Sequence, residues 1–254
     1  MTQIICIANQ KGGVGKTTTA VNLSAALALS GKRTLLVDCD PQANATTGVG
    51  IDKNELAQTL YHGLIGEAEI ERLIVPTEIE WLQVLPSRVE LIGFEVEMMN
   101  ENGREQALKR CLSRIVDRYE YIILDCPPSL SLLTLNAMAA ADALLIPLQC
   151  EFYALEGLGQ LLQTKALINS GINPGLSIAG ILLTMFDKRT NLSHQVAEEA
   201  KRYFQGKERV FTTSIPRNVR LGEAPSFGKP ILLYDAGSMG AQSYIALAKE
   251  IIDG

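Results

Sequence analysis

A glycine-rich segment close to the start of the chain constrains the fold more than any other part of the sequence. It reads Lys-Gly-Gly-Val-Gly-Lys-Thr-Thr-Thr over residues 11–19, after a short apolar run at 4–8 and at the start of a helical pattern at 16–30. Glycine lets a chain turn tightly, so that successive backbone N–H groups can point into one anion-sized hollow. The following helix adds the positive end of its dipole. We therefore predict a phosphate-binding loop between a first strand and a first helix.

The rest of the chain alternates between short apolar runs and longer helical patterns, which is typical of a parallel sheet with crossover helices. Several runs are apolar throughout, as expected for strands that helices cover on both faces. The predicted strands are 4–8, 34–38, 82–85, 121–125, 143–147, 178–184 and 210–213. The predicted helices are 16–30, 104–118, 130–141, 155–170, 192–204 and 241–253. We expect an α/β fold with a doubly wound, mostly parallel sheet flanked by helices, as one domain over residues 1–254.

The composition agrees with such a core and argues against other classes of protein. Of the 254 residues, 47% are apolar and 20% are charged, which excludes a disordered chain. No apolar run reaches the roughly 18 residues of a membrane-spanning helix, and the first residues lack the pattern of an export signal. The five cysteines show no close C-x-x-C spacing, which argues against a disulfide framework and a zinc site. We expect a cytoplasmic protein with no membrane partner.

Two lysines stand on either side of the glycine-rich loop. Lys16 is placed to contact the β- and γ-phosphates of a nucleotide, and the hydroxyl of Thr17 to bind Mg²⁺. The usual pattern of such loops, G-x-x-x-x-G-K-[ST], has glycine where this chain has Gln10, and Lys11 is the unusual feature. Two lysines supply more positive charge than one phosphate tail requires. We infer that Lys11 points away from its own loop, toward a nucleotide held by a second subunit.

A dinucleotide-binding loop is the main alternative interpretation of this segment. Asp38 closes the next strand about 20 residues on, where a ribose-binding acid would lie. However, such a loop holds pyrophosphate with backbone groups and a helix dipole, and has no need for a lysine followed by a magnesium-binding hydroxyl. The consecutive Lys16 and Thr17 therefore favour a nucleoside triphosphate loop.

Three acidic residues are predicted to lie at the same edge of the sheet as this loop, because ligands bind at the carboxyl ends of parallel strands. Asp40 is placed to orient or deprotonate a water that attacks the γ-phosphorus. Asp38 is expected to contribute to the magnesium shell through water, or to hold the neighbouring loop. Asp125 ends an apolar strand and is expected to hold Thr17 or a metal-bound water.

The charge of the chain is distributed unevenly. Its net charge is −5, but residues 185–230 contain nine Lys or Arg against five Asp or Glu. A basic surface of this kind indicates a polyanionic partner in spite of the acidic total.

The three motifs together resemble the deviant Walker-A P-loop NTPases of the ParA/MinD type. The resemblance covers nearly the whole chain and rests on K-G-G-V-G-K-T-T-T at 11–19, L-V-D-C-D-P-Q-A-N-A-T at 36–46 and D-C-P-P-S at 125–129. The segments T-M-F-D-K-R-T-N-L at 184–192 and S-I-P-R-N-V-R-L-G-E-A-P-S-F-G-K-P at 214–230 are similar to the chromosome-partitioning ParA/Soj branch. In that branch Lys11 would be the signature lysine.

The resemblance implies an ATPase with ATP and Mg²⁺ as cofactors and weak activity of its own. Its members form ATP-dependent homodimers that bind double-stranded DNA without sequence preference, and a ParB-type partner stimulates hydrolysis. The implied catalytic residues are Lys11, Lys16 and Asp40. The implied nucleotide contacts are Lys11, Gly12, Gly13, Val14, Gly15, Lys16, Thr17 and Thr18.

Four further residues receive roles from the resemblance alone. Pro216 and Asn218 fall where this family contacts adenine. Arg189 and Arg220 match basic positions implicated in DNA binding, and arginines on phosphates give sequence-independent, salt-sensitive affinity. A solvated surface without DNA contact is the competing interpretation for both arginines.

Two other functions stay open as alternatives. The same loop could serve an ATP-dependent enzyme that modifies a small molecule, although no motif suggests a substrate pocket. A MinD-like positioning ATPase would need a basic amphipathic tail, whereas residues 241–254 contain one lysine against two acids.

Overall fold

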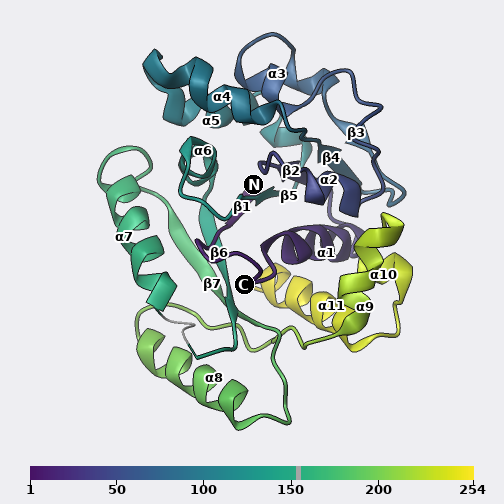
Figure 1. The fold of residues 1–254 in the computed structure, drawn as a ribbon, viewed down its shortest axis with the longest axis vertical. Helices are drawn as coiled ribbons and strands as arrows, with labels where there is room; N and C mark the ends of the chain where they lie inside the picture. The colour runs from purple at the N-terminus through teal and green to yellow at the C-terminus, as the bar shows by residue number, and fades with distance from the viewer. Residues whose placement is uncertain (153–155) are drawn as a thin grey trace.

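The structure, a computed structural model, describes residues 1–152 and 156–254 (Figure 1). Within these residues, seven strands form one sheet in the order β3-β4-β2-β5-β1-β6-β7. All neighbouring strands pair in parallel except the edge pair β3–β4, so the predicted doubly wound, mostly parallel sheet is confirmed. The strands are β1 (Gln3–Ile7), β2 (Thr34–Asp38), β3 (Val75–Pro76), β4 (Leu82–Leu85), β5 (Tyr121–Asp125), β6 (Ala143–Gln149) and β7 (Ser177–Thr184).

Helices cover both faces of this sheet (Figure 1). The longer ones are α1 (Lys16–Leu29), α4 (Leu91–Glu97), α5 (Ala107–Leu112), α6 (Leu132–Ala140), α7 (Glu156–Gly171), α8 (Asn191–Phe204) and α11 (Met239–Ile252). The shorter ones are α2 (Asn44–Gly48), α3 (Leu60–Leu64), α9 (Val219–Glu223) and α10 (Ile231–Tyr234). Short 3₁₀ turns are η1 (Ile70–Arg72), η2 (Met98–Asn100), η3 (Arg104–Gln106), η4 (Val116–Arg118) and η5 (Ala224–Phe227).

The alternation of side chains along each strand divides the core into two layers. In β1, Ile5 and Ile7 pack with α1 and α11 on one face, whereas Ile4 and Cys6 pack with α5, α6, α7 and α8 on the other. Since both faces are buried, the strands consist of continuous apolar runs, as the sequence indicated.

The register of the three central strands brings the predicted site together. Asp38 at the end of β2 pairs with Asp125 at the end of β5, and Asp125 in turn pairs with Ile7 at the end of β1. The loop after β1 and both acidic strand ends therefore meet at the carboxyl edge of the sheet, where α/β proteins bind ligands.

The prediction of a strand at 210–213 is wrong. Val210 forms one isolated bridge with Ile181 of β7, and pairing is then interrupted until the N–H of Ile215 donates to the carbonyl of Leu183 at 2.8 Å. The backbone N–H groups of Thr212 and Thr213 donate instead to the carboxylate of Glu250, at 2.8 and 3.0 Å. In the register of this bridge the N–H of Thr213 would be the next donor to β7, and because it already donates to Glu250 the ladder stops.

The predicted helix at 104–118 is broken into η3, α5 and η4. Asn136 of α6 causes the first break: its side-chain oxygen accepts from the N–H of Leu108 at 3.1 Å, and its amide donates to the carbonyl of Arg104 at 2.9 Å. These two backbone groups would bond to each other in a regular α-helix. The other predicted helices are present with shifts of one or two residues at their ends, and position 155 lies outside the described residues.

None of the helices within the described ranges combines the length and the apolar character needed to cross a membrane.

Candidate active site

The glycine-rich loop joins β1 to α1 and has the conformation that its glycines allow. Gly13 and Gly15 have φ angles of 73° and 89°, in the left-handed region that favours glycine. A Cβ atom at Gly12 or Gly13 would meet nothing within 4 Å, so open space adjoins this part of the loop. No side chain of the described residues caps the amino end of α1, which leaves its first N–H groups for an anion.

Contacts with the sheet hold the loop in place before any ligand binds. The hydroxyl of Thr184, at the end of β7, donates to the carbonyl of the buried Val14 at 2.8 Å. The amide of Asn9 donates to the carbonyl of Pro147 at 2.7 Å, and its oxygen accepts from the N–H of Lys11 at 3.0 Å. The loop is thus anchored to β6 and β7 and is preorganised for an anion.

The two lysines of the loop point to different places. The ammonium group of Lys16 donates to the carbonyl of Lys11 at 3.0 Å and is nearly buried, inside the curve of the loop. Burial lowers the pKa of Lys16, and the nearby carboxylate of Asp125 partly opposes this shift. The ammonium group of Lys11 instead forms an ion pair with Glu151, after β6, and both side chains are more than a third exposed. Lys11 is therefore held away from its own loop.

Asp125 and Thr17 form the part of the site that fits a divalent cation. Asp125 is fully buried, and neither of its carboxylate oxygens has a hydrogen-bond partner of normal geometry within the described chain. Burial and the neighbouring carboxylate of Asp38 raise the pKa of Asp125 well above its usual range, while the hydroxyl of Thr17 lies close enough to lower it. An unpartnered buried carboxylate beside a hydroxyl is a donor set that suits hydrated Mg²⁺.

Asp38 is occupied by the neighbouring loop. Its Oδ2 accepts from both the N–H and the hydroxyl of Thr46, each at 2.7 Å, and its Oδ1 accepts from the N–H of Asp40 at 3.1 Å. Burial raises the pKa of Asp38 to about 6, although these hydrogen bonds lower it. Of its two predicted roles, these contacts correspond to holding the loop, and a role in the magnesium shell stays a prediction.

Asp40 lies beside this network at the mouth of the site. It is 7% exposed, and its Oδ1 accepts from the N–H of Gln42 at 2.9 Å, which fixes the turn that follows β2. Asp38 accepts from the backbone N–H of Asp40, and Thr46 in turn donates to Asp38. The position of the Asp40 carboxylate therefore depends on Asp38, Thr46 and Gln42 together.

A hollow of about 260 Å³ adjoins the loop at the start of α1. Gly15 and Thr18 line one side of it, and Pro216 and Asn218 line another. The oxygen of Asn218 accepts from the N–H of Arg220 at 2.8 Å, which orients the side-chain amide. The structure therefore brings the two predicted adenine contacts next to the predicted phosphate contacts, in a space of suitable size for a base.

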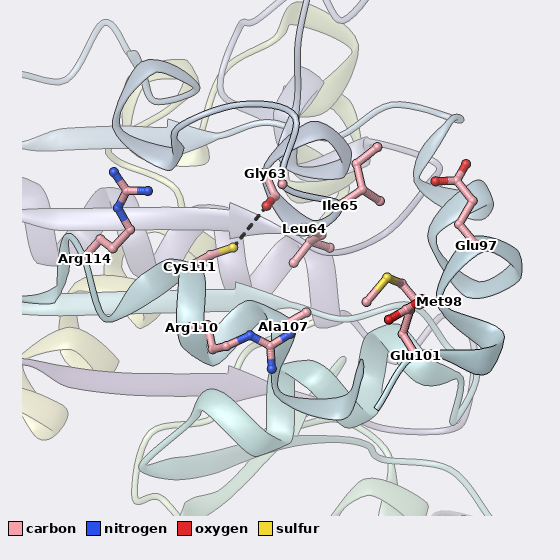
Figure 2. Close-up of a pocket in the computed structure, with 11 residues that line it drawn as sticks. Gly63, Leu64, Ile65, Glu97, Met98, Glu101, Ala107, Arg110, Cys111 and Arg114 are labelled. Atoms are coloured by element: carbon pink, nitrogen blue, oxygen red, sulfur yellow. Dashed lines mark hydrogen bonds between the residues drawn. The ribbon is translucent and has the colours of Figure 1, made fainter. Parts of the chain in front are cut away.

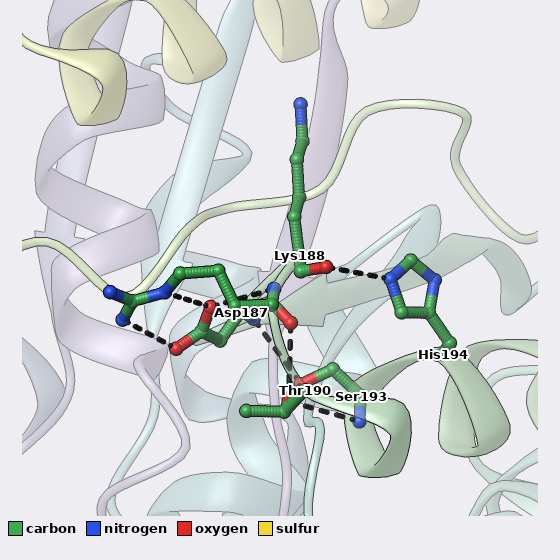
Figure 3. A network of polar contacts seen from close by, with 6 residues as sticks. Asp187, Lys188, Thr190, Ser193 and His194 are labelled. Carbon is green, nitrogen blue, oxygen red and sulfur yellow. Dashed lines mark hydrogen bonds and ion pairs between the residues drawn. The ribbon is translucent and has the colours of Figure 1, made fainter.

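A second hollow, of about 400 Å³, lies next to the first and is lined by basic residues. Lys188, Arg189 and Arg217 gather around it, and Pro216 lines both hollows. Arg189 forms a two-pronged ion pair with Asp187, at 3.0 and 2.9 Å, which lowers the pKa of that carboxyl to about 2 (Figure 3). Figure 3 shows Lys188 extending away from this network, with its backbone carbonyl on the His194 ring.

Arg220 lies outside the basic hollow. Its guanidinium group pairs with Glu223 at 2.9 Å and approaches Asp235 at 3.6 Å. Arg220 is thus outside the group that contains Arg189, and both arginines pair with acidic neighbours.

Sequence reasoning missed several residues that build the site. Thr46 is the last residue of the motif at 36–46. Only its spacing of eight residues from Asp38 indicates that a helical turn brings it back to the end of the strand. Glu151 lies 140 positions from Lys11, and no local pattern links them. Arg217 could have been found, because it stands between Pro216 and Asn218 in a basic segment.

Comparison with known proteins agrees with this geometry. A family model described as "AAA domain" matches residues 2–178. The chain is 57% identical to the chromosome partitioning protein ParA of Myxococcus xanthus, over 98% of this chain and 88% of that protein. It is 56% identical to the sporulation initiation inhibitor protein Soj of Bacillus subtilis, over 99% and 98% of the two chains.

Among solved structures, a cobyrinic acid a,c-diamide synthase from Mycobacterium smegmatis, with bound ADP and magnesium, has a TM-score of 0.87. It is 36% identical and covers 99% of this chain and 94% of its own. The level of identity to the partitioning proteins, over nearly their full lengths, decides the assignment: the chain belongs to the ParA/Soj family of chromosome-partitioning P-loop ATPases.

Proposed function

We propose that this protein is an ATP-driven switch for DNA segregation. In this proposal ATP and Mg²⁺ bind at the carboxyl edge of the sheet, and the loaded chain forms a homodimer that binds double-stranded DNA without sequence preference. Slow hydrolysis, stimulated by a ParB-type partner, returns the protein to the monomer. Residues 1–254 act as one ATPase domain in the cytoplasm, at the nucleoid.

The observation that supports this proposal most strongly is the different placement of the two lysines. Lys16 lies inside the loop, where it can neutralise the β- and γ-phosphates of its own nucleotide. Lys11 is held on Glu151, outside the loop. A partly exposed ammonium group of this kind can exchange Glu151 for the more highly charged phosphates of a nucleotide in a facing subunit. ATP would then join two copies of the chain.

The remaining residues support hydrolysis. When bound, Mg²⁺ neutralises charge on the phosphate oxygens, and Thr17 and Asp125 are the residues that would hold it directly and through water. Asp40, fixed by Asp38, orients a water or accepts its proton. A similar solved structure, the diamide synthase, contains ADP and magnesium, which supports a nucleotide and magnesium site in this fold.

The basic hollow supports binding to DNA. Lys188, Arg189 and Arg217 line it, and Pro216 also lines the hollow proposed for the base. Cations that contact phosphates give affinity without sequence preference and with strong salt dependence. The nucleotide and the DNA would therefore lie on either side of one short loop.

Sedimentation velocity with ATP, ADP and no nucleotide tests the dimer directly. The wild-type chain should sediment as a dimer only with ATP. Lys16→Ala should lose nucleotide binding, whereas Lys11→Ala should bind nucleotide as a monomer. A monomeric wild-type protein at saturating ATP, or a Lys11→Ala protein that still dimerises, would contradict the proposed role of Lys11.

DNA shift assays test the rest of the cycle. Asp40→Ala should remain an ATP-bound dimer that binds DNA without turnover. Arg189→Glu should form the dimer but lose DNA at moderate salt, and we expect the same of Arg220→Glu. Normal ATP turnover by Asp40→Ala would remove Asp40 from the mechanism.

A small-molecule-modifying enzyme is the second candidate, because the diamide synthase is similar over the full chain. It predicts ATP consumption only when cobyrinic acid and an amide donor are supplied, with no effect of DNA. The higher identity to the partitioning proteins favours the first function. A MinD-like positioning cycle predicts ATP-dependent binding to anionic vesicles, which the same preparations can measure.

A further inference from the structure

Two glycines bring distant backbone segments into direct contact next to the candidate active site. Gly50 follows α2, and Gly228 follows η5. A Cβ atom at Gly50 would lie 2.9 Å from the carbonyl oxygen of Gly228, and a Cβ atom at Gly228 would lie 3.1 Å from the Cα of Gly50. Neither distance leaves room for a side chain, so the two backbones touch. We call this approach the Gly50–Gly228 contact.

Both glycines have a conformation that other residues rarely adopt. Their φ angles are 88° at Gly50 and 61° at Gly228, in the left-handed region. A Cβ atom at Gly228 would also lie 3.4 Å from the carbonyl oxygen of Thr47, in α2. Since no side chain lies between the two backbones that could rotate out of the way, a displacement of one acts directly on the other.

The segment of residues 40–50 is held at its front end by the hydrogen bonds of Asp38, described above. Ala43, between Asp40 and α2, has a φ angle of 57° although it is not glycine, and it is fully buried. Its N–H donates to the carbonyl of Asp40 at 2.9 Å. A residue with a Cβ atom keeps such a conformation only where its surroundings hold it. The segment therefore depends on contacts beyond its own sequence.

Contacts behind α2 supply this support. A Cβ atom at Gly48 would lie 3.1 Å from the Cγ2 of Val21, so α2 rests against the helix that follows the phosphate loop. On its other side α2 packs against η5, and Gly50 meets Gly228 there. The segment that carries the Asp40 carboxylate is thus enclosed between α1 and η5.

Gly228 belongs to a stretch of chain that also borders the base hollow. We call residues 218–231, which include α9 and η5, the arm. Leu221 and Gly222 of the arm line the base hollow together with Asn218. A Cβ atom at Gly240 of α11 would lie 2.8 Å from the Cγ of Leu221, so the arm packs closely on α11 at this point.

The far end of the arm is fixed to the phosphate-binding helix. The N–H of Ile231 donates to the side-chain oxygen of the buried Asn22 at 2.7 Å. The amide of Asn22 donates in turn to the carbonyl of Thr18 at 2.7 Å. The arm is therefore tied to α11 and α1 on either side of Gly228, and it can act as a fixed support for α2.

We propose that the Gly50–Gly228 contact positions Asp40 for hydrolysis, which makes the two glycines positioning residues of the ATPase. The arm supports the end of α2, α2 keeps Thr46 on Asp38, and Asp38 holds the backbone of Asp40. Since the arm also borders the base hollow, the base end and the γ-phosphate end of the site share one support. The proposal rests on the proposed function in that Asp40 is the residue that acts on the attacking water.

Gly228→Ala and Gly50→Ala test the contact, because each adds one Cβ atom between the two backbones. Gly66→Ala is the matched control. Gly66 has a φ angle of 83°, so alanine there has the same unfavourable backbone, but its Cβ atom would meet nothing of the described chain within 4 Å. Gly66 lines a hollow of about 600 Å³ between α3, the end of α4 and α5, which shares none of its lining residues with the base hollow or the basic hollow (Figure 2).

For each variant we measure ATP turnover at saturating Mg-ATP with DNA, and the affinity for ADP. A misplacement of roughly 1 Å can cost about 100-fold in rate, so a smaller shift of Asp40 should lower turnover about tenfold in Gly228→Ala and in Gly50→Ala. Both should bind ADP as the wild type does, and Gly66→Ala should match the wild type in both measurements. Unchanged turnover of Gly228→Ala, or weaker ADP binding in place of slower turnover, would overturn the proposal.

The double variant Gly50→Ala/Gly228→Ala separates one shared contact from two local defects. If both glycines act through the contact, the first added Cβ atom already parts the backbones, and the double variant should turn over about as fast as the slower single variant. A loss equal to the product of the two single losses, about 100-fold, would mean independent defects and would rule out a shared contact.

Hydrogen exchange tests the contact with both glycines intact. The Lys11→Ala protein is used, since we expect it to bind ATP as a monomer, so that no second subunit protects the amides. The N–H groups of Gly228 and Lys229 donate to the carbonyls of Pro225 and Ala224, at 3.0 and 3.3 Å. ATP, compared with ADP, should slow exchange of these two amides together with those of α2. An effect of the γ-phosphate that stops at α2 would contradict the proposal.

Asp40→Ala, measured beside the glycine variants, distinguishes a failure of the contact from a failure of the proposed function. If Asp40→Ala hydrolyses ATP normally, the assignment of Asp40 is wrong and this proposal falls with it. If Asp40→Ala is inactive but Gly228→Ala is as fast as the wild type, only the role of the contact is wrong.

Discussion

Thr46 provides the sharpest test of how the site is built, because a neighbouring threonine serves as its control. The Thr46 hydroxyl donates to the buried Asp38 at 2.7 Å and accepts from the N–H of Ser87 at 3.0 Å. Thr46→Val keeps nearly the same shape and removes both hydrogen bonds. A hydrogen bond to a carboxylate contributes about 1.5–3 kcal/mol, and a buried N–H left without a partner costs about 1–3 kcal/mol. We therefore expect a loss of about 3–5 kcal/mol in the free energy of unfolding.

Thr47→Val is the matched control. Its hydroxyl donates to the carbonyl of Ala43 at 3.2 Å within the same short helix and is partly exposed, so water can replace this bond. The loss should be below about 1 kcal/mol. Urea unfolding of both variants at constant pH, with the slopes compared to check two-state behaviour, gives the two values. Thr46→Ser should recover most of the lost stability. If Thr46→Val loses no more than Thr47→Val, the network does not hold the site.

Three further predictions follow from the ion pairs and the pKa shifts. Glu151→Gln should release Lys11 and lower the protein concentration needed for ATP-dependent dimers up to about 30-fold in sedimentation, since the dimer would break two exposed pairs that contribute about 1 kcal/mol or less each; weaker dimerisation would contradict this. Folded Asp38, with a pKa of about 6, keeps its proton at pH values where the unfolded chain has lost it. Stability should therefore fall by about 2 kcal/mol as the pH rises from 4 to 7, and less in Asp38→Asn, as unfolding curves at several pH values can measure. Asp187→Asn keeps the turn but frees Arg189, so DNA affinity should rise, because the arginine no longer has to leave an anionic partner to reach a phosphate; an affinity equal to that of the wild type would mean that Arg189 does not contact phosphate.

The residues predicted from the sequence are mostly those whose chemistry is local. The glycines at 13 and 15, Lys16 and Asp125 could be assigned because a strand, a tight turn and a helix follow one another within a few residues. The carboxyl ends of parallel strands meet by topology alone, so grouping Asp38 with Asp125 required no knowledge of side-chain packing.

The features that the sequence did not predict depend on contacts between distant segments. The helix at 104–118 is broken by Asn136, and the run at 210–213 is kept out of the sheet by Glu250. In both cases a polar side chain far along the chain binds backbone groups that local propensity assigned to a ladder or a helix. The pairing of Lys11 with Glu151 is of the same kind. The periodicity of a segment depends on that segment alone. It therefore contains no information about a distant side chain that binds the backbone groups of the segment.

If the basic hollow binds DNA as proposed, its position limits how ATP can control that binding. Hydrogen bonds at 3.0 and 3.2 Å join Phe186 to Ile215 and Arg217, so the two loops that carry the basic residues are already fixed to each other in one copy of the chain. A monomer without nucleotide therefore already presents its cations, but one hollow with a few phosphate contacts would bind DNA weakly at physiological salt. If dimerisation aligns two hollows on one duplex, the second contact becomes intramolecular, and affinity increases by about 100-fold or more without any change in either hollow. ATP would then control DNA binding by changing the number of chains that contact one duplex, and not by changing the shape of either surface.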